Sequence, residues 1–152
     1  MDFSGRYRFS ASRHAVWMAL NDAAVLKAVI PGCESIEWTG RSTLDLRIKV
    51  NLGIVHPVFS GELELANVLP AASYTLAGRG KGILGLAHGA ADITLADDGA
   101  ATILSFAAEG TADGRIMQLG RKLVGNSAQK VIDGFFIRIG EEMGVAVTPL
   151  PN

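Results

Sequence analysis

Residues that could carry out catalysis are few in this chain, and their spacing matches no common catalytic or metal-binding motif. The three histidines, His14, His56 and His88, lie far apart, and no His-x-x-x-His or Cys-x-x-Cys pair is present to hold zinc. The single cysteine, Cys33, follows a Pro-Gly pair and has no base beside it, so we interpret it as a small apolar residue. No Gly-x-Ser-x-Gly motif occurs. The sequence therefore predicts no catalytic residue, no metal and no intrinsic cofactor.

A glycine-rich segment formally matches the Gly-x-Gly-x-x-Gly pattern of dinucleotide-binding proteins. It reads Gly80-Lys81-Gly82-Ile83-Leu84-Gly85. A dinucleotide site needs a helix next, because the helix N-terminus holds the pyrophosphate, and here a strand pattern continues instead. We interpret the segment as a gate over the mouth of a cavity, with an apolar tip suited to contact with a membrane or a partner. The gate residues are Gly80, Gly82, Ile83, Leu84 and Leu86.

Charge and composition exclude several classes of protein. The 152 residues include 14 basic and 15 acidic side chains, and the formal net charge is -1. A nucleic-acid-binding protein usually has a basic excess, so we expect no nucleic-acid partner. Hydrophobic residues make up 49% of the chain, which is enough for the core of one folded domain.

The cysteine content and the N-terminal residues indicate a cytoplasmic location. A single cysteine cannot form an intrachain disulfide, as is usual in a reducing compartment. The first six residues lack a signal-peptide pattern, and no apolar run approaches the ~20 residues that span a bilayer.

Apolar periodicity predicts a strand, two short helices and then several more strands. Residues 3–9 alternate as in a strand. Ser12 and Asp22 are suitable N-caps for two short helices, and Pro31-Gly32 ends the second. Alternating residues between 36 and 108 then predict six further strands, with Leu44, Leu46 and Ile48 on one face of the clearest.

The last part of the chain changes to helical spacing. Apolar residues recur at helical intervals between 114 and 143, which predicts one long helix. This order of elements is typical of a curved antiparallel sheet wrapped around a helix, an α+β domain over residues 1–147. We expect residues 148–152 to form a short, loose tail.

Several positions on the expected inner face of the sheet are small: Gly61, Gly78, Gly80, Gly89 and Ala91. Small residues opposite a helix either leave volume for a ligand or simply allow the sheet to bend. No inward position carries a charge, so we expect a cavity there to be apolar, and Tyr74 could donate a hydrogen bond to a ligand carbonyl. The predicted lining is Trp17, Phe59, Leu63, Tyr74, Leu76, Leu104, Phe106, Met117 and Phe135.

A series of residues along nearly the whole chain resembles a known family. The residues are Gly5, Arg13, Val16-Trp17, Leu20-Asn21-Asp22, Leu26, Ile30-Pro31-Gly32-Cys33, Phe59-x-Gly61, Pro70, Tyr74, Gly78-x-Gly80, Ala87-x-Gly89-x-Ala91, Leu119-Gly120-x-Lys122-Leu123 and Phe135-Phe136. In order and spacing they resemble the carbon monoxide dehydrogenase subunit (CoxG) family of the START-like, Bet v 1-type (SRPBCC) helix-grip superfamily.

This resemblance implies a fold and a role. The fold would be a seven-stranded antiparallel sheet that grips the C-terminal helix. The role would be that of a non-catalytic accessory protein beside a molybdenum hydroxylase of the carbon monoxide dehydrogenase type, with a pocket for a quinone or similar lipid. Family members are linked to recruitment of that enzyme to the membrane, which implies peripheral contact with its inner face.

Two alternatives to this role stay open at this point, and so does the oligomeric state. An enzyme of the cyclase or hydrolase kind that shares the fold would need a pocket-facing acid or base. A protein-interaction subunit would have a filled, vestigial cavity. A homodimer through the exposed sheet or helix surface is compatible with each of these roles.

Overall fold

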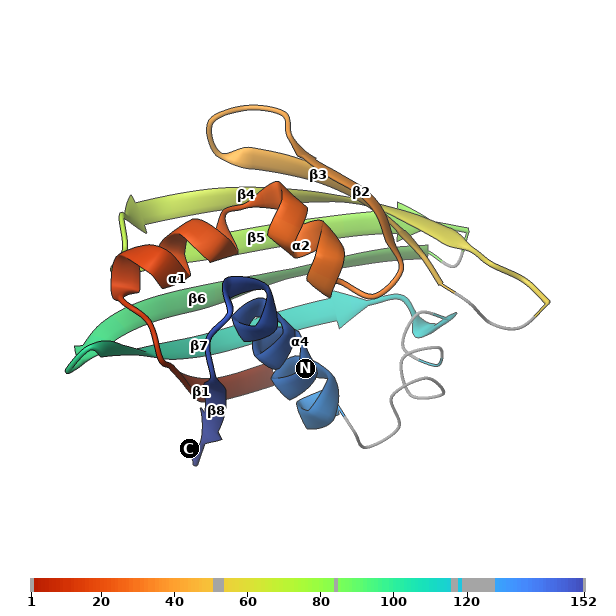
Figure 1. The fold of residues 1–152 in the computed structure, drawn as a ribbon. Coiled ribbons are helices and arrows are strands. Elements are labelled where there is room, and N and C mark those ends of the chain that lie inside the picture. Colours follow the sequence, from red (N-terminus) through yellow and green to blue (C-terminus); the bar gives the residue numbers. More distant parts are fainter. Residues whose placement is uncertain (1, 51–53, 84, 116–117, 119–127, 152) are drawn as a thin grey trace.

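One antiparallel sheet of eight strands forms the body of the protein, and its helices lie on one face of that sheet (Figure 1). The computed structural model describes residues 2–50, 54–83, 85–115, 118 and 128–151. The strand order is β2-β3-β4-β5-β6-β7-β1-β8, and neighbouring strands run antiparallel. The predicted α+β helix-grip architecture is therefore confirmed.

The elements follow the predicted order along the chain. They are β1 (Asp2–Phe9), α1 (Arg13–Leu20), α2 (Ala23–Val29), β2 (Cys33–Trp38), β3 (Thr43–Lys49), β4 (Val58–Leu69), β5 (Ser73–Gly82), β6 (Gly85–Asp98), β7 (Ala101–Ala112), α4 (Ala128–Met143) and β8 (Val147–Leu150). The long helix predicted over residues 114–143 is observed from Ala128 to Met143 as α4. Its expected residues 116–117 and 119–127 lie outside the described residues.

The predicted count of seven strands and the loose tail were wrong. Val147–Leu150 forms β8, which pairs with β1 from Phe9 to Arg6. Pro149 lacks a backbone N–H and is tolerated because β8 is an edge strand. This short strand has too few residues for its alternation to stand out in the sequence.

Both predicted helix starts are confirmed, because side chains at the first turns satisfy free backbone N–H groups. The Ser12 hydroxyl accepts a hydrogen bond from the Ala15 N–H at 3.2 Å. The Asp22 carboxylate accepts from the N–H of Ala24 at 2.9 Å and of Val25 at 3.4 Å. Local sequence therefore fixes where α1 and α2 begin.

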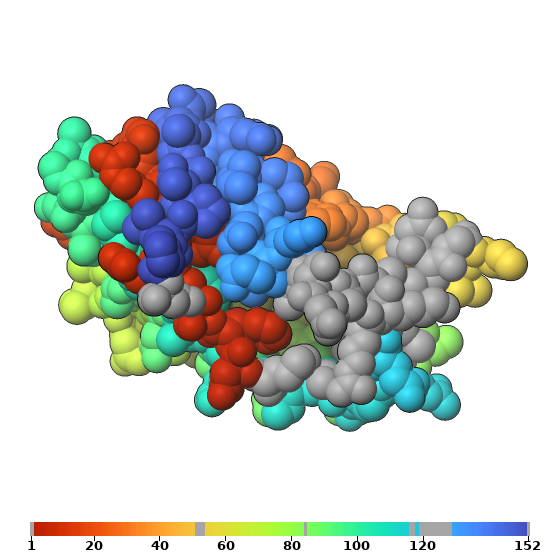
Figure 2. Space-filling view, turned by 90° about the horizontal axis from the view of Figure 1, so that it is seen from below, coloured from red at the N-terminus to blue at the C-terminus, as the bar shows by residue number. Residues whose placement is uncertain are grey.

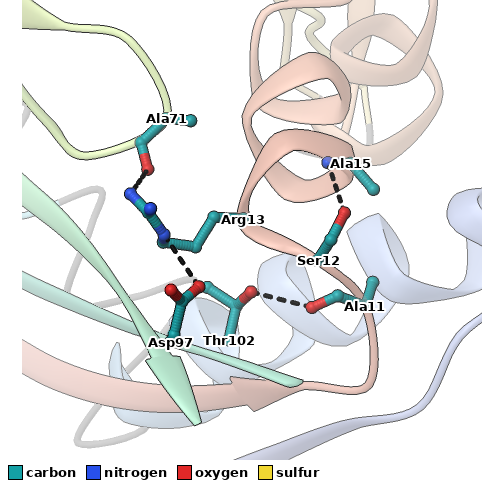
Figure 3. Close-up of polar contacts among 7 residues, drawn as sticks. All are labelled: Ala11, Ser12, Arg13, Ala15, Ala71, Asp97 and Thr102. Atoms are coloured by element: carbon teal, nitrogen blue, oxygen red, sulfur yellow. Dashed lines mark hydrogen bonds and ion pairs between the residues drawn. The ribbon is translucent and has the colours of Figure 1, made fainter. Parts of the chain in front are cut away.

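Arg13 ties the start of α1 to two hairpin turns (Figure 3). Its Nε lies 2.8 Å from Asp97 Oδ1, and its Nη1 donates to the Ala71 carbonyl at 2.9 Å. Beside it, the Thr102 hydroxyl donates to the Ala11 carbonyl at 2.7 Å. Asp97 lies near the end of β6, just before the β6–β7 turn, and Ala71 lies in the β4–β5 turn, so one side chain fixes α1 over one end of the sheet.

Large side chains fill the half of the inner face that lies under α1, α2 and the C-terminal part of α4. Tyr7, Leu95 and Leu104 of the sheet are at most 5% exposed, and Val16 and Ile139 of the helices are fully buried. This filled half is the hydrophobic core, and its burial supplies most of the driving force for folding.

The C-terminal end of α4 packs against β8 through a glycine. A Cβ atom added to Gly140 would overlap the Val147 side chain and lie 2.9 Å from the Val145 carbonyl oxygen. On the same helix, the Arg138 Nε donates to the Val29 carbonyl at 3.1 Å, which joins α4 to α2. The helix is therefore anchored at its C-terminal end by close packing and one interhelical hydrogen bond.

We predict that Gly140→Ala and Gly134→Ala have opposite effects on the free energy of unfolding. The first should lower it by roughly 1–3 kcal/mol, because the new methyl group overpacks against β8. The second should raise it by up to about 1 kcal/mol, because alanine favours the helix and requires only a small shift of the Arg138 Nη1 atom, 3.1 Å from the new methyl group, while Nε keeps its bond to Val29. Urea unfolding followed by circular dichroism measures both. Shifts of the same sign would contradict this packing.

Candidate functional site

The inner face of β4 to β7 carries a patch of small residues that the strand register brings together. Gly78 pairs with Gly89, and Gly89 pairs with Gly110. The neighbouring row, nearer to the β5–β6 connection, contains one glycine or alanine from each of β4, β5, β6 and β7: Gly61, Gly80, Ala87 and Ala112. We call the patch the small-residue floor: Gly61, Gly78, Gly80, Ala87, Gly89, Ala91, Ala108, Gly110 and Ala112.

Part of this floor is not covered by any side chain that the structure describes. Among the described residues, a Cβ added to Gly80 would have only the Ser60 carbonyl oxygen within 4 Å, at 3.5 Å. At Gly78, by contrast, an added Cβ would lie 2.9 Å from the Leu63 side chain, which leans over it. Leu63, Leu76 and the floor residues are half-buried. The prediction of small inward residues at Gly61, Gly78, Gly80, Gly89 and Ala91 is confirmed.

An aromatic cluster separates the floor from the filled half. The Phe136 ring of α4 lies 4.4 Å from the Tyr7 ring, 5.7 Å from the Phe106 ring and 5.1 Å from the Phe135 ring, between centroids. Phe106 and Phe135 are half-buried, whereas Tyr7 is 1% exposed. Such a wall offers edge and face contacts to a flat, apolar ligand lying over the floor.

A carboxylate lies on the inner face beside this cluster, which corrects the expectation that no charge points inward. The Tyr7 hydroxyl donates to Asp133 Oδ1 at 2.6 Å. The Gln129 amide donates to the same carboxylate oxygen at 2.8 Å and to the Tyr7 hydroxyl at 3.2 Å. Strand alternation could not reveal Asp133, because it comes from α4, but its place three residues before Phe136 puts both on one helix face.

Burial and hydrogen bonding keep both tyrosines protonated. Burial, followed by the hydrogen bond to Asp133, raises the pKa of Tyr7 well above its usual range. Burial alone raises the pKa of Tyr74 to about 12. Within the described part of the chain the Tyr74 hydroxyl has no hydrogen-bond partner, and its ring stands edge-on to Trp17 at 5.1 Å. Tyr74 is therefore available as a hydrogen-bond donor.

The structure places the other predicted site residues in three groups. Trp17, Phe59 and Phe135 are half-buried on the inner side, whereas Leu104 is fully buried in the core. Gly80 and Gly82 lie at the open end of β5, while the gate residues Ile83 and Leu86 are 81% and 60% exposed. Leu86 pairs with Lys81 on the outer face. Met117 and Leu84 lie outside the described residues.

The opposite face of the sheet has a groove that the sequence did not predict. It has a volume of about 830 Å³ and is lined mostly by outward side chains of β2 to β6, together with Leu46 and three residues of the small-residue floor, Gly61, Gly80 and Ala87. Three carboxylates, Glu37, Asp45 and Glu62, follow one another across β2, β3 and β4, and Glu62 pairs with Arg79 at 3.1 Å. The alternation in the sequence predicts which residues face outward, but it does not predict whether the twist of the sheet hollows that face into a groove.

Metal binding and membrane spanning are not indicated in the described residues. Among them no cluster of three or more histidine, cysteine or carboxylate side chains could hold a metal ion. Within the same residues, no helix combines the length and the apolar character needed to cross a bilayer.

We predict that the folded protein releases no tyrosine proton near pH 10. The chain contains two tyrosines, so tyrosinate absorbance reports on Tyr7 and Tyr74 alone. Their ordinary pKa of 10.0 applies to the unfolded chain, which releases protons that the folded chain retains. The free energy of unfolding should therefore fall as the pH rises above 10.0, with a shallower fall in Tyr7→Phe. Titration of both tyrosines at their ordinary pKa in the folded protein would contradict this.

Solved structures share this architecture at low sequence identity. A conserved protein from Geobacillus kaustophilus superposes with a TM-score of 0.83 at 22% identity, over 97% of this chain and 99% of that chain. The Zhui aromatase/cyclase of a Streptomyces species superposes with a TM-score of 0.67 at 13% identity, over 95% and 93% of the two chains. A Chromobacterium violaceum protein gives 0.69 at 14% identity, over 93% and 96%. These likenesses show the fold.

The family is shown by a match along the sequence. No protein with a curated description matches the chain. The family model that describes the carbon monoxide dehydrogenase subunit CoxG matches residues 5–144, which include every described element except β8 and the first residues of β1. The chain belongs to this carbon monoxide dehydrogenase subunit (CoxG) family and has the START-like, Bet v 1-type fold.

Proposed function

We propose that this chain is a non-catalytic accessory protein that binds a flat apolar molecule, a quinone or similar lipid, between the small-residue floor and α4. The observation that carries the proposal is the register of β4 to β7, which places glycine and alanine together where large side chains would otherwise fill the core. Apolar volume beside a few polar groups is typical of small-molecule sites.

The polar groups suit a ligand that carries a carbonyl. Tyr74 has a protonated hydroxyl without a partner in the described residues, and it can donate to a carbonyl oxygen. Both N–H groups of the Gln129 amide already donate, to Asp133 and to the Tyr7 hydroxyl, so Tyr74 is the donor that this region offers to a ligand. A quinone has carbonyl oxygens on a flat ring and an apolar tail, so its chemistry fits a hydroxyl donor and an aromatic wall.

The proposed partner follows from the family. An accessory protein of this family would act beside a molybdenum hydroxylase of the carbon monoxide dehydrogenase type, either by recruiting it to the membrane or by accepting its electrons on the bound quinone. The bound molecule then carries the redox chemistry, and the protein contributes an apolar, water-poor pocket.

A second candidate function is an enzyme of the cyclase or hydrolase kind. The specific observation in its favour is Asp133, an inward carboxylate in contact with Tyr7. An acid or base of this kind is what such an enzyme needs. However, the raised pKa of Tyr7 makes its hydroxyl a poor proton donor at neutral pH, and the Asp133 oxygen that it contacts is already shared with Gln129.

We predict that Gly80→Val and Leu76→Trp weaken binding of a quinone analogue by about tenfold or more, equal to ~1.4 kcal/mol or more. Valine at Gly80 meets no side chain that the structure describes and suits a strand, so the fold should persist, and tryptophan at Leu76 fills volume above the floor. The affinity of Gly80→Val is measured from the quenching of tryptophan fluorescence as the quinone analogue is added. The affinity of Leu76→Trp, which contains an additional tryptophan, is measured by isothermal titration calorimetry.

The matched control is Ala77→Val. Ala77 lies between the two tested positions on β5 but faces outward and is exposed. Its affinity should equal that of the unmodified chain. Unchanged affinity in Gly80→Val and Leu76→Trp, with both variants folded, would show that the ligand does not lie on the floor.

A further inference from the structure

A small hydrogen-bond network joins α4 to β1 beside the aromatic cluster. Tyr7 contributes a hydroxyl from β1, and Gln129 and Asp133 contribute an amide and a carboxylate from α4. In Figure 2 the light-blue N-terminal part of α4 lies next to the red residues of β1, where this network forms. Tyr7 is buried, Asp133 is half-buried and Gln129 is exposed, so the network runs from the core to the surface.

The Tyr7 side chain leans towards the small-residue floor. A Cβ added to Gly5 would lie 3.3 Å from the Tyr7 hydroxyl oxygen and 2.8 Å from the Phe106 ring. The rings of Tyr7 and Phe106 are nearly parallel, with centroids 6.3 Å apart. The next inward residue of β7 after Phe106 is Ala108, which belongs to the floor. The network therefore stands at the border of the floor, next to the aromatic wall.

Every side-chain N–H and O–H group of the network is already used. The Tyr7 hydroxyl donates to Asp133 Oδ1 at 2.6 Å. The Gln129 amide donates to the same carboxylate oxygen at 2.8 Å and to the Tyr7 oxygen at 3.2 Å. Within the described residues, Asp133 Oδ2 and the Gln129 carbonyl oxygen accept no hydrogen bond. The network therefore offers a ligand only acceptors.

The neighbouring groups hold these donors in place. If the Gln129 amide turned over, its carbonyl oxygen would meet the Asp133 carboxylate oxygen at 2.8 Å, and two acceptors at that distance repel each other. Burial, followed by the hydrogen bond to Asp133, raises the pKa of Tyr7 well above its usual range, so the hydroxyl keeps its proton. The acceptor character of this corner is therefore fixed by its own contacts.

Tyr74, the other polar group beside the floor, has the opposite character. It lies in the same cross-strand row as Gly5, because Gly5 pairs with Phe106, Phe106 with Ile93 and Ile93 with Tyr74. Its hydroxyl is protonated and has no partner among the described residues. The floor is therefore bordered by a hydrogen-bond donor from β5 and by an acceptor from α4 above β1.

We propose that Asp133 recognises a hydroxyl group of the ligand, so that the floor binds a hydroquinone more tightly than the corresponding quinone. A hydroxyl group both donates and accepts, so a hydroquinone satisfies Asp133 as well as Tyr74. The carbonyl of a quinone satisfies Tyr74 alone and brings a second acceptor towards Asp133. Hydrogen bonds to a carboxylate are also stronger than those between neutral groups.

This inference rests on the proposed function, because it concerns the ligand of the same site. It adds the redox form of that ligand, and it gives the inward carboxylate a role without catalysis. If the hydroquinone binds tenfold more tightly than the quinone, the midpoint potential of the bound two-electron couple rises by about 30 mV.

The test compares duroquinone with durohydroquinone by equilibrium dialysis under argon. The two probes share one methylated ring and differ only in carrying carbonyl or hydroxyl groups. The unmodified chain should bind the hydroquinone at least about tenfold more tightly, equal to ~1.4 kcal/mol. A redox titration of the probe with the protein in excess should show a midpoint potential raised by ~30 mV or more.

The variant Asp133→Asn should reverse the preference. Hydrogen bonds from Tyr7 and Gln129 hold the new amide oxygen at the position of Oδ1, so the new NH₂ group replaces Oδ2 and offers a donor. This variant should therefore favour the quinone. The matched control is Glu141→Gln, which removes the same charge from an exposed position near the end of α4 and should keep the preference for the hydroquinone.

The outcomes separate this inference from the proposed function. Equal affinities of the unmodified chain for the two probes, or a hydroquinone preference that persists in Asp133→Asn, would overturn the inference and leave the proposed function in place. Absence of binding of either probe to the unmodified chain would overturn both. If circular dichroism shows that Asp133→Asn is unfolded, the redox titration of the unmodified chain decides, and an unchanged midpoint potential would overturn the inference.

Discussion

The antiparallel register of β4 to β7 is the constraint on which the rest of this structure depends. Because side chains alternate between faces, a shift of one residue would turn Gly78, Gly89 and Gly110 outward and their larger neighbours inward. In the observed register these glycines form one cross-strand row that contributes no side chains of its own, although the Leu63 side chain leans over Gly78. The sheet therefore has a half that is packed and a half that is shallow.

The helices enforce this division because they are fixed over the packed half. Arg13 ties α1 to the two hairpin turns at that end, and the close contact of Gly140 with β8 anchors the C-terminal end of α4. The Tyr7–Asp133 hydrogen bond joins α4 to β1 at the boundary between the halves. Small residues in place of large ones in a core usually lower the free energy of unfolding. The tight packing in the other half of the sheet therefore has to offset the stability that the floor does not contribute.

Local features of the sequence predicted much of the fold. Ser12 and Asp22 gave the helix starts because capping involves residues two or three apart, and alternation gave the inward face of each strand. Features that depend on distant pairing could not be predicted: the glycine row, the outer groove and the addition of β8 to β1. Asp133 was missed because the phase of a helix with several glycines, relative to the sheet, is set by tertiary packing. The proposed lining residues remain a prediction.

The most direct test of the central claim is mass spectrometry of an organic extract from protein purified without detergent. We expect a quinone or related isoprenoid lipid in roughly equal amount to the chain, since the floor offers one site. An empty extract, together with no uptake of added quinones, would contradict the account. The shallow half of the sheet would then be a vestigial cavity, and the protein would act through its surfaces alone.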